Sequence, residues 1–364
     1  MAEKQESLGH TVVVGGCGFL GSHIVKLLLS RHPKTKISIL DLRIKDQIPN
    51  PQTSYHSCDI TDAESLLQLF KELKPDVVIH TASSTAFLPK DITYKINVEG
   101  TKNLLKAAQE TGVKAFVYTS SASVIMGEMT EMINVDERWP VVIGDRQPEY
   151  YSHTKAVAEM AVLEANRSSK TFLTCAIRPA AIFGEGDVQL LPPMVKAAKS
   201  GQSKFQLGSN DNLFDFTYVG NIAHAHLLAA VGLLATAKLN LSPLDTERID
   251  GEAFFITNDS PVYLWDFAHS VYREAGATTG VDPNSVWHIG ADFAITIAGL
   301  AEWALWLFGK TPNLTRSRVR YSTLTRYYNI SKAKERLGYA PIVGLEEGIK
   351  RGVKDVLARD FPEK

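Results

Sequence analysis

The chain has 364 residues, and its 39 Lys and Arg nearly balance its 40 Asp and Glu, which gives a formal net charge of −1. Apolar residues make up 45% of the chain and charged residues 22%, as in ordinary globular proteins, so wholesale disorder and collagen-like or coiled-coil structures are excluded. The near-neutral charge provides no general electrostatic attraction to nucleic acid, and the length suits one large domain or two.

Apolar runs and helical periodicities alternate over the first half of the chain. The Val-rich run at 11–14 stops at glycines, which predicts a buried strand, and the apolar spacing over 19–30 predicts a helix. The alternation continues with strands at 36–41, 77–80, 115–120 and 172–178 and with helices at 62–73, 92–110 and 151–165. This order predicts parallel βαβ units, and therefore an α/β fold with a doubly wound parallel sheet of the Rossmann type.

A glycine-rich loop joins the first strand to the first helix. Gly15, Gly18 and Gly21 fit the pattern G-x-x-G-x-x-G, in which glycines let the backbone approach a pyrophosphate at a helix N-terminus. Asp41 ends the next strand, where a carboxylate accepts hydrogen bonds from ribose hydroxyls and repels a 2′-phosphate. We therefore expect a dinucleotide site that takes NAD. Arg43 keeps NADP open as the alternative, because its cation could approach a 2′-phosphate.

Prolines punctuate shorter, mixed elements beyond Pro179, where the regular alternation ends. We therefore expect an NAD-binding domain over 8–180, to which 212–232 and 251–257 return. Residues 181–364 are expected to form mainly a smaller, mixed substrate-binding lobe.

A tyrosine and a lysine share one face of the predicted helix at 151–165. Tyr151 and Lys155 are four residues apart, and their helix follows a strand that ends in the polar residues 119–121. A free phenol has a pKa of about 10, which is too high for a base at neutral pH. A neighbouring ammonium group and the positive nicotinamide ring both favour the phenolate, so we expect Lys155 and the bound cofactor to lower the pKa of Tyr151 and Tyr151 to act as the catalytic base.

Three serines are candidates to hold the substrate oxygen near this base. Ser121 is preferred, while Ser123 and Ser120 remain alternatives, with Ser123 also a candidate substrate contact. A second Tyr-Lys pair with the same spacing, Tyr328 and Lys332, has no polar strand end beside it and is interpreted as structural.

Several motifs along most of the chain resemble the extended short-chain dehydrogenase/reductase family. They are GGCGFLG at 15–21, CDITD at 58–62, HTAS at 80–83, NVEGT at 97–101, YTSSASV at 118–124, YSHTK at 151–155 and RPAAIFGEGD at 178–187. The resemblance implies adenine contacts from Asp59 and Ile60, a role for Asn97 in an active-site water relay, and a nicotinamide beside 179–182. The implied cofactor contacts are Gly15, Gly18, Phe19, Leu20, Gly21, Asp41, Arg43, Asp59, Ile60, Thr81, Ala82, Ser83, Asn97, Thr119, Tyr151, Lys155, Pro179, Ala181 and Ile182.

Later segments resemble the 3β-hydroxysteroid dehydrogenase branch, and most of all its sterol-4α-carboxylate 3-dehydrogenases (decarboxylating). They are FDFTYVGNIAHAHLLAA at 214–230, GEAFFITND at 251–259 and RYYNISKAKERLGYAP at 326–341. The resemblance implies NAD-dependent oxidation of a 3β-hydroxyl on a 4-carboxylated sterol or triterpenoid, followed by loss of CO₂. It also implies a partner oxidase and ketoreductase, and it allows a homodimer.

Three other functions stay open beside this one. They are a 3β-hydroxysteroid dehydrogenase/isomerase, a nucleotide-sugar epimerase or dehydratase on the same scaffold, and a catalytically silent NAD-sensing regulator. The apolar stretch at 289–308 argues against a polar sugar site, and the presence of both Tyr151 and Lys155 argues against a silent protein.

The most apolar stretch of the chain predicts contact with a membrane or with an apolar substrate. Residues 289–309 are long enough for a span, but Asp292 and Glu302 would be costly in hydrocarbon, whereas Trp303 and Trp306 suit a headgroup boundary. We expect a helix that lies on the cytoplasmic face of the endoplasmic reticulum membrane or that forms a lid over the substrate. A buried core helix and a true span are the alternatives.

Basic residues follow this stretch and could meet anionic lipid. They are Lys310, Arg316, Arg318, Arg320 and Arg326, and the alternation at 316–320 predicts a strand with three cations on one face. His224 and His226 are interpreted as helix-packing residues, because no acid or cysteine is placed to complete a metal site.

Three cysteines are too few and too far apart for a disulfide framework or a zinc site. Cys17, Cys58 and Cys175 form no CxxC pair, so we expect a reducing compartment and no metal. Residues 1–10 are polar, so no signal peptide is expected and the protein is not predicted to be secreted.

Overall fold

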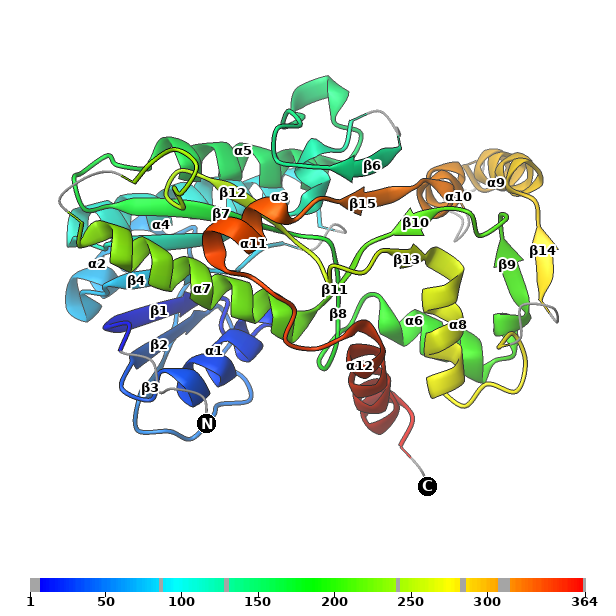
Figure 1. Ribbon diagram of the computed structural model, residues 1–364, viewed down its shortest axis with the longest axis horizontal. Helices are drawn as coiled ribbons and strands as arrows, with labels where there is room; N and C mark the ends of the chain where they lie inside the picture. Colours follow the sequence, from blue (N-terminus) through cyan, green and yellow to red (C-terminus); the bar gives the residue numbers. More distant parts are fainter. Residues whose placement is uncertain are drawn as a thin grey trace.

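A seven-stranded parallel sheet forms the centre of the protein. The computed structural model describes residues 7–84, 88–127, 131–239, 243–281, 286–306 and 315–362. The strand order is β12-β7-β5-β4-β1-β2-β3, and all neighbours are parallel (Figure 1). The strands are β1 His10–Val14, β2 Lys36–Asp41, β3 Thr53–Ser57, β4 Val77–His80, β5 Ala115–Thr119, β7 Leu173–Pro179 and β12 Ala253–Ile256. The predicted doubly wound parallel sheet is confirmed, and β3 is an additional strand that the periodicity did not indicate.

Helices cover both faces of this sheet because successive side chains of a strand point in opposite directions. Val13 packs into one core with helices α1 Phe19–Arg31 and α7 Val219–Ala237. Its neighbours Val12 and Val14 pack into a second core with α2, α4 and α5 on the other face (Figure 1). These three helices are α2 Ala63–Leu73, α4 Gly100–Thr111 and α5 Tyr150–Glu164.

The helix expected over 92–110 is built from three pieces. They are α3 Lys90–Tyr94, a π-helical turn Lys95–Glu99 and α4. Such a turn often marks a functional site, because the extra residue redirects a side chain. Here it carries the buried Asn97.

A smaller lobe lies beyond the carboxyl ends of the central strands. Its main sheet has the order β13-β10-β15-β6, and two further strand pairs join β8 to β11 and β9 to β14. The strands are β6 Met132–Val135, β8 Ala181–Phe183, β9 Phe205–Leu207, β10 Leu213–Phe214, β11 Phe216–Tyr218, β13 Val262–Tyr263, β14 Trp287–Ile289 and β15 Arg326–Tyr328. The helices of the lobe are α6 Leu191–Lys199, α8 Leu264–Glu274, α9 Ala291–Trp306, α10 Arg316–Thr323 and α12 Leu345–Asp360, whereas α11 Ser331–Leu337 packs against β12 and α7 of the central domain. Short 3₁₀ turns occur at Ala122–Ile125, Gly144–Arg146 and Gln202–Lys204.

The predicted strand over 316–320 is wrong, because this segment forms helix α10. Val319 of α10 is fully buried against Ala294 and Ala298 of α9. Arg316 is exposed and pairs with Glu302 of α9, with a distance of 2.7 Å between Nε and Oε2. The alternating cations fitted either conformation, and packing against α9 decided between them. Arg318 and Lys310 have side chains outside the described residues.

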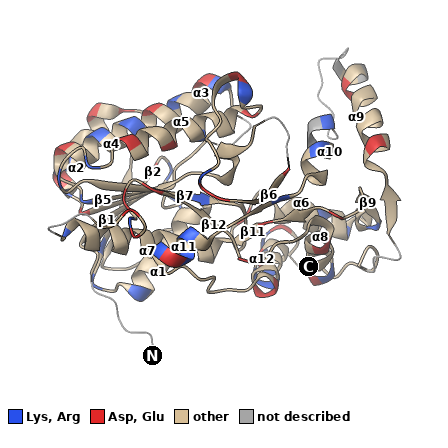
Figure 2. Ribbon diagram, turned by 45° about the horizontal axis from the view of Figure 1, so that its top comes forward, with Lys and Arg blue, Asp and Glu red and all other residues tan. Residues whose placement is uncertain are grey.

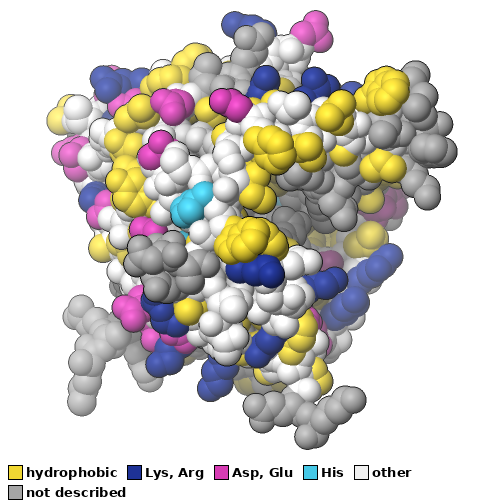
Figure 3. Space-filling model, turned by 90° about the vertical axis from the view of Figure 1, so that its right-hand side faces the viewer, with side chains coloured by type: hydrophobic (Ala, Val, Ile, Leu, Met, Phe, Trp, Pro, Cys, Tyr) yellow, Lys and Arg dark blue, Asp and Glu magenta, His cyan; other side chains and the backbone are white. Residues whose placement is uncertain are grey.

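Helix α9 presents its large apolar side chains to the outside. Phe293, Leu300 and Trp303 are 65%, 60% and 66% exposed, whereas the small Ala294 and Ala298 face α10. Figure 2 shows α9 projecting beside α10 with few charged residues, and Figure 3 shows apolar side chains gathered at this end of the molecule. The described part of the segment is therefore not a buried core helix. The side chain of Trp306 lies outside the described residues.

Among the described residues, the helix that is long and apolar enough to span a membrane is α7, not α9. More than half of its apolar window is buried, because α7 packs against the central sheet and α1. These properties are typical of a core helix, so α7 is weak evidence for a membrane span.

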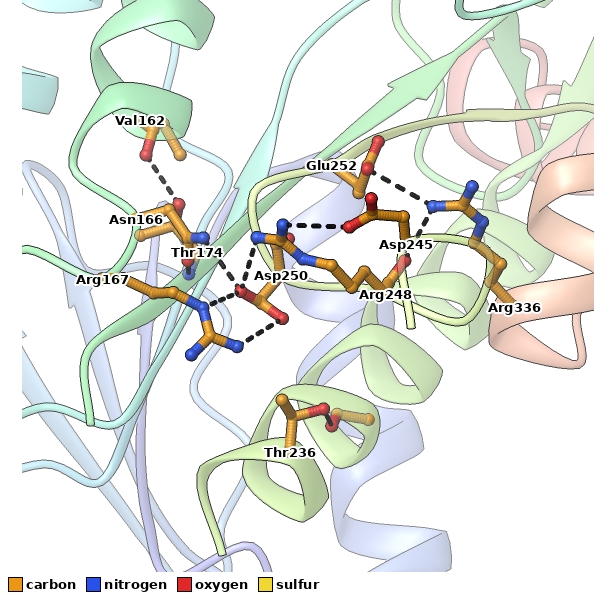
Figure 4. Close-up of polar contacts among 11 residues, drawn as sticks. Val162, Asn166, Arg167, Thr174, Thr236, Asp245, Arg248, Asp250, Glu252 and Arg336 are labelled. Carbon is orange, nitrogen blue, oxygen red and sulfur yellow. Dashed lines mark hydrogen bonds and ion pairs between the residues drawn. The ribbon is translucent and has the colours of Figure 1, made fainter. Parts of the chain in front are cut away.

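A buried carboxylate ties the segment before β12 to the turn between α5 and β7. Asp250 accepts hydrogen bonds from Arg167 Nε at 2.7 Å and from Asn166 Nδ2 at 3.0 Å, and Arg248 lies 3.3 Å away (Figure 4). Burial acts to raise the pKa of Asp250, but the hydrogen bonds from Arg167 and Asn166 outweigh it and leave that pKa lowered. The network fixes the edge of the sheet far from the cavities described below.

Candidate active site

A cavity of about 620 Å³ opens at the carboxyl ends of the central strands, where parallel sheets bind their ligands. It brings together most of the cofactor contacts implied by the sequence. These are Gly15, Gly18, Phe19, Leu20, Gly21, Asp41, Asp59, Ile60, Thr81, Ala82, Ser83, Thr119, Tyr151, Lys155, Pro179 and Ile182. Arg43, Asn97 and Ala181 do not line it. The cavity also includes Asp187, the last residue of the RPAAIFGEGD motif, and Val188 and Gln189, which follow it; none of the three was among the predicted cofactor contacts.

The glycine loop has no room for side chains. Gly15 has a φ of +80°, in the left-handed region that favours glycine. A Cβ on Gly21 would lie 2.1 Å from the carbonyl oxygen of Gly15, because α1 begins directly against the loop. This close packing leaves backbone N–H groups at the start of α1 beside the cavity, which fits a bound pyrophosphate.

Asp41 is held at the end of β2 by backbone hydrogen bonds. Its carboxylate accepts from the backbone N–H of Cys17 at 3.1 Å and from that of Arg43 at 3.2 Å. These bonds hold the carboxylate beside the glycine loop, where Asp41 lines the cavity. Arg43 is exposed and lies outside that cavity. The site therefore fits a dinucleotide whose ribose hydroxyls meet Asp41.

Tyr151 and Lys155 lie in the first turns of α5 and line the same cavity. Lys155 Nζ donates to the carbonyl oxygen of Thr119 at 2.5 Å and stands 4.3 Å from the ring centre of Tyr118. Burial lowers the pKa of Lys155 to about 7, because no carboxylate lies close enough to offset desolvation fully. Burial also raises the pKa of Tyr151, while a hydrogen bond with the Ser83 hydroxyl acts to lower it.

Without a bound cofactor the pKa of Tyr151 is therefore raised, and its lowering by Lys155 together with a nicotinamide stays a prediction. Desolvation penalises the phenolate, and the Lys155 ammonium is engaged by the Thr119 carbonyl. The phenol stays protonated until another positive charge reaches the cavity. A bound oxidised nicotinamide would supply that charge.

Asn97 supports the site from behind rather than lining it. Its Oδ1 accepts from the Ser84 backbone N–H at 2.8 Å and from the Ser83 hydroxyl at 3.1 Å. Its Nδ2 donates to Thr154 Oγ1 at 2.9 Å, and Thr154 donates to the backbone oxygen of Tyr151. Asn97 thus fixes the segment after β4 against the helix that carries the tyrosine.

His226 packs behind the lysine, on helix α7. Its Nε2 lies 2.7 Å from Thr119 Oγ1, and its Nδ1 lies 2.8 Å from the carbonyl oxygen of Ile222. Burial lowers the pKa of His226 to about 4, which keeps the ring neutral. His224 instead lies 2.8 Å from an Arg31 nitrogen of α1. Among the described residues, no group of His, Cys, Asp and Glu could hold a metal ion.

The three candidate serines differ in where they lie. Ser121 borders the first cavity and a second cavity of about 250 Å³, and Tyr151 also borders both. Ser123 lines only the second, and its Oγ lies 2.8 Å from that of Ser121. Ser120 is buried, lines the first cavity, and its hydroxyl has no partner among the described residues. Ser121 is therefore the serine shared with the tyrosine where the two cavities meet.

The second cavity contains residues that the sequence analysis interpreted otherwise. Tyr328 lines it, although it was expected to be structural, and it stacks on Phe255 with ring centres 4.7 Å apart. Lys332 is directed elsewhere, because its Nζ donates to Glu252 at 2.6 Å. Tyr328 and Lys332 therefore do not form a second catalytic pair.

Arg326 lines the second cavity and was wrongly placed among the lipid-facing cations by its sequence position. It is 3% exposed, and its guanidinium lies 3.3 Å from the ring centre of Tyr321 and 4.6 Å from that of Phe214. Within the described residues it has no ion pair, and its Nε has no hydrogen-bond acceptor. Its Nη2 donates to the backbone oxygen of Tyr321 at 3.0 Å, and its Nη1 lies 3.6 Å from the sulfur of Met126. The sequence pattern did not distinguish Arg326 from the other basic residues of this region, because it is β15 in the folded lobe that brings Arg326 to the cavity.

A second buried arginine, Arg178, shows that a buried guanidinium without an ion pair is unusual. Arg178 is also almost fully buried, but it binds both carboxylate oxygens of Glu159, with its Nε 3.0 Å from Oε2. Buried charges are normally paired in this way, since an unpaired ion loses its hydration without compensation. Arg326 is therefore a buried cation without an ion pair among the described residues, in a cavity that the acids Glu149 and Asp215 also line.

Comparisons with known proteins identify the family of this chain. Residues 12–288 match the model of the 3-beta hydroxysteroid dehydrogenase/isomerase family. The chain belongs to this family. Among its relatives, the decarboxylating sterol-4-alpha-carboxylate 3-dehydrogenase of Saccharomyces cerevisiae is 41% identical, over 93% of this chain and 95% of the relative. The enzyme of the same name from Schizosaccharomyces pombe is 42% identical, over 94% of this chain and 96% of the relative. The enzyme from Homo sapiens is 34% identical, over 96% of this chain and 89% of the relative. The resemblance predicted from the motifs is confirmed.

Solved structures share the fold at low sequence identity. UDP-glucose 4-epimerase of Thermotoga maritima has a TM-score of 0.70 and 21% identity, over 97% of this chain and all of the epimerase chain. UDP-glucose 4-epimerase of Thermus thermophilus, solved in complex with NAD, has a TM-score of 0.69 and 21% identity, over 96% of this chain and 99% of that one. These likenesses establish the extended Rossmann-type architecture.

Proposed function

We propose that the protein oxidises the 3β-hydroxyl of a 4α-carboxylated sterol or related triterpenoid to the 3-ketone with NAD, and that the carboxylate leaves as CO₂. Its relatives carry the name of this activity. The observation that carries the proposal is the unpaired Arg326 in the cavity bordered by Tyr151 and Ser121. The 4-carboxylate of such a substrate is next to its 3-hydroxyl. A base for the hydroxyl and a cation for the carboxylate are therefore needed in one cavity.

Each residue at the junction of the cavities then has a defined task. Tyr151 accepts the hydroxyl proton, Ser121 holds the 3-oxygen, and Lys155 fixes the Thr119 carbonyl and adds positive charge. The residues that line the first cavity would hold NAD, which would supply the acceptor for the hydride from C3. Once the ketone has formed, the bond from C4 to the carboxylate can break because the ketone takes up the electron pair as an enolate. Arg326 binds the carboxylate and orients it before that step.

The first cavity supports a nicotinamide cofactor, and Asp41 favours NAD over NADP. A carboxylate at this position hydrogen-bonds ribose hydroxyls and repels a 2′-phosphate. We assign residues 8–180, 212–232 and 251–257 to this cofactor-binding domain and the remainder of 181–364 to the substrate lobe. Steady-state rates with each cofactor test this assignment, and a higher kcat/KM with NADP would contradict it.

The function is tested with purified protein, NAD and a 4α-carboxysterol. We expect NADH and CO₂ in equal amounts, and a 3-ketone without the carboxylate by mass spectrometry. CO₂ without NADH would contradict hydride transfer as the first step. A shifted double bond in the product would favour a 3β-hydroxysteroid dehydrogenase/isomerase, and thermal stabilisation by a UDP-sugar would favour an epimerase.

We also propose that the exposed face of α9 lies on a membrane. Phe293, Ile297, Leu300 and Trp303 are spaced to share one side of the helix, and each is exposed. Trp287 of β14 extends the apolar surface and is 70% exposed. A sterol acid partitions into bilayers, so a protein docked on the cytoplasmic face of the endoplasmic reticulum can take it up directly.

Vesicle sedimentation tests this surface. Trp303→Asp together with Leu300→Asp should release the protein from vesicles of phosphatidylcholine and phosphatidylserine, because each change places a charge at the contact. The matched control is Leu239→Asp, an exposed apolar residue at the end of α7 on another part of the molecule. Equal binding by all variants would exclude α9 as the membrane contact.

A further inference from the structure

A row of four side chains borders the second cavity and ends at an exposed carboxylate. Ser121 Oγ lies 2.8 Å from Ser123 Oγ, and Ser123 Oγ lies 2.7 Å from Ser152 Oγ. Ser152 Oγ lies 2.6 Å from Glu149 Oε2. Ser121, Ser123 and Glu149 line the cavity, and Ser152 is fully buried in the first turn of α5. Glu149 precedes that helix and is also exposed to solvent, so it stands at the mouth of the cavity. We call these four residues the serine relay.

The hydrogens of the serine relay can point in either direction. A hydroxyl has one hydrogen, so Ser152 can donate to Glu149 or to Ser123 but not to both. When Ser152 donates to the Glu149 carboxylate, Ser123 donates to Ser152 and Ser121 to Ser123. When Glu149 is protonated, each of these bonds can reverse. Moving every hydrogen along one bond transfers one proton between Glu149 and the cavity.

The proposed reaction requires such a transfer, and the present inference rests on that reaction. Oxidation breaks the O–H bond, whose proton goes to Tyr151, and the C3–H bond, whose hydride goes to NAD. Loss of CO₂ breaks the bond from C4 to the carboxylate carbon, and the electron pair stays behind in the 3-enolate. A C4–H bond must then form. The carboxylate substrate and NAD thus give the ketone, CO₂ and NADH with no net change in protons.

We propose that the serine relay supplies the proton that C4 receives, and that Glu149 recovers it from water. The inner hydroxyls of the relay line the cavity that also holds Tyr151 and Arg326, where the 3-oxygen and the carboxylate bind. Glu149 is the exposed end of the row and the one carboxylate in it. Tyr151 keeps the separate task of accepting the hydroxyl proton. Hydride transfer therefore precedes the step that needs the relay.

Buffer rescue of Glu149→Ala tests the proposal. With NAD and a 4α-carboxysterol, NADH formation in the first turnover should match the wild type, because hydride transfer does not use Glu149. Steady-state turnover should fall about 100-fold or more, in line with the loss of a proton-transfer group. Imidazole or acetate should restore turnover in proportion to its concentration, since a small acid can replace the exposed carboxylate.

Two further variants separate the relay from other effects. Ser152→Ala breaks the row at a buried position, so turnover should fall and added buffer should not restore it. Asp145→Ala removes another exposed acid before α5 that makes no hydrogen bond or ion pair among the described residues, and it should match the wild type. Thermal unfolding of each variant shows whether the start of α5 is intact.

The outcomes distinguish this inference from the proposed function. If the wild type yields neither NADH nor CO₂, the proposed function fails, and the inference fails with it. If the wild type yields both, the relay is overturned when Glu149→Ala keeps full turnover. It is also overturned when the variant loses the first turnover equally or ignores the buffer concentration. A merely structural contact at the start of α5 predicts a lower thermal midpoint without rescue by buffer.

Discussion

Replacing Arg326 by Met tests how the cavity recognises a carboxylated substrate. Met fills most of the space of the arginine stem between Tyr321 and Phe214 but carries no charge. A hydrogen bond to a charged group contributes about 1.5–3 kcal/mol, and about 1.4 kcal/mol corresponds to a factor of ten. We therefore expect kcat/KM for a 4α-carboxysterol to fall roughly 10- to 150-fold.

The assay compares two substrates in one preparation. NADH formation is measured with the 4α-carboxysterol and with the matched 3β-hydroxysterol that lacks the carboxylate. If the second sterol is not turned over, its inhibition constant against the first is measured instead. The ratio of the two constants does not depend on the folded fraction. Arg326→Lys is the control that keeps the charge, and an intermediate ratio is expected because an ammonium cannot bind both carboxylate oxygens in one plane.

Stability gives an independent check on the same variant. Arg326 is a buried cation without an ion pair among the described residues, and apolar substitution of a buried charge is often neutral or stabilising. The thermal midpoint of Arg326→Met should therefore be at least that of the wild type. Equal losses with both substrates, together with a lowered midpoint, would show that Arg326 supports the fold and does not bind the carboxylate.

Three further predictions address the tyrosine, the lysine and the sheet edge. Tyr151→Phe should reduce turnover to background while calorimetry still detects NAD binding, because only the phenolic oxygen is removed. Burial lowers the pKa of Lys155 to about 7, so between about pH 7 and its unfolded pKa near 10.5 the unfolded chain binds more protons. The wild type should thus gain stability relative to Lys155→Met as the pH rises from 7 to 10, and parallel denaturation curves across this range would contradict that sign. Asp250→Ala leaves Arg167 and Arg248 without their shared carboxylate and should lower the free energy of unfolding by about 3 kcal/mol in urea titrations, with the exposed Asp245→Ala as a nearly neutral control.

Local chemistry accounts for the parts that the sequence predicted well. The Val-rich run of β1 is buried on both faces, so it reads as a strand without reference to its neighbours. The glycine loop is equally local, because Gly15 and Gly21 must approach each other whatever lies beyond them. Tyr151 and Lys155 share a helix face through their spacing alone.

Other features depended on contacts between distant segments. The segment at 316–323 became a helix because Val319 packs under α9. The pKa of Tyr151 rises because of burial, which the spacing of Tyr151 and Lys155 does not encode. The interpretation of Tyr328 as structural missed the second cavity, because residues from several elements of both lobes create that cavity.

The amino-acid sequence by itself determined the doubly wound sheet, the dinucleotide loop and the position of the tyrosine base, since these follow from periodicity and backbone sterics within short segments. Only the tertiary structure decided that Arg326 faces the cavity and that Glu149 ends a row of serines beside it. The physical reason is that charge recognition and proton transfer require atoms within about 3 Å. Arg326 reaches the cavity only when the lobe has packed against the sheet, and Ser152 and Glu149 reach Ser123 only when α5 has packed beside the turn that follows β5.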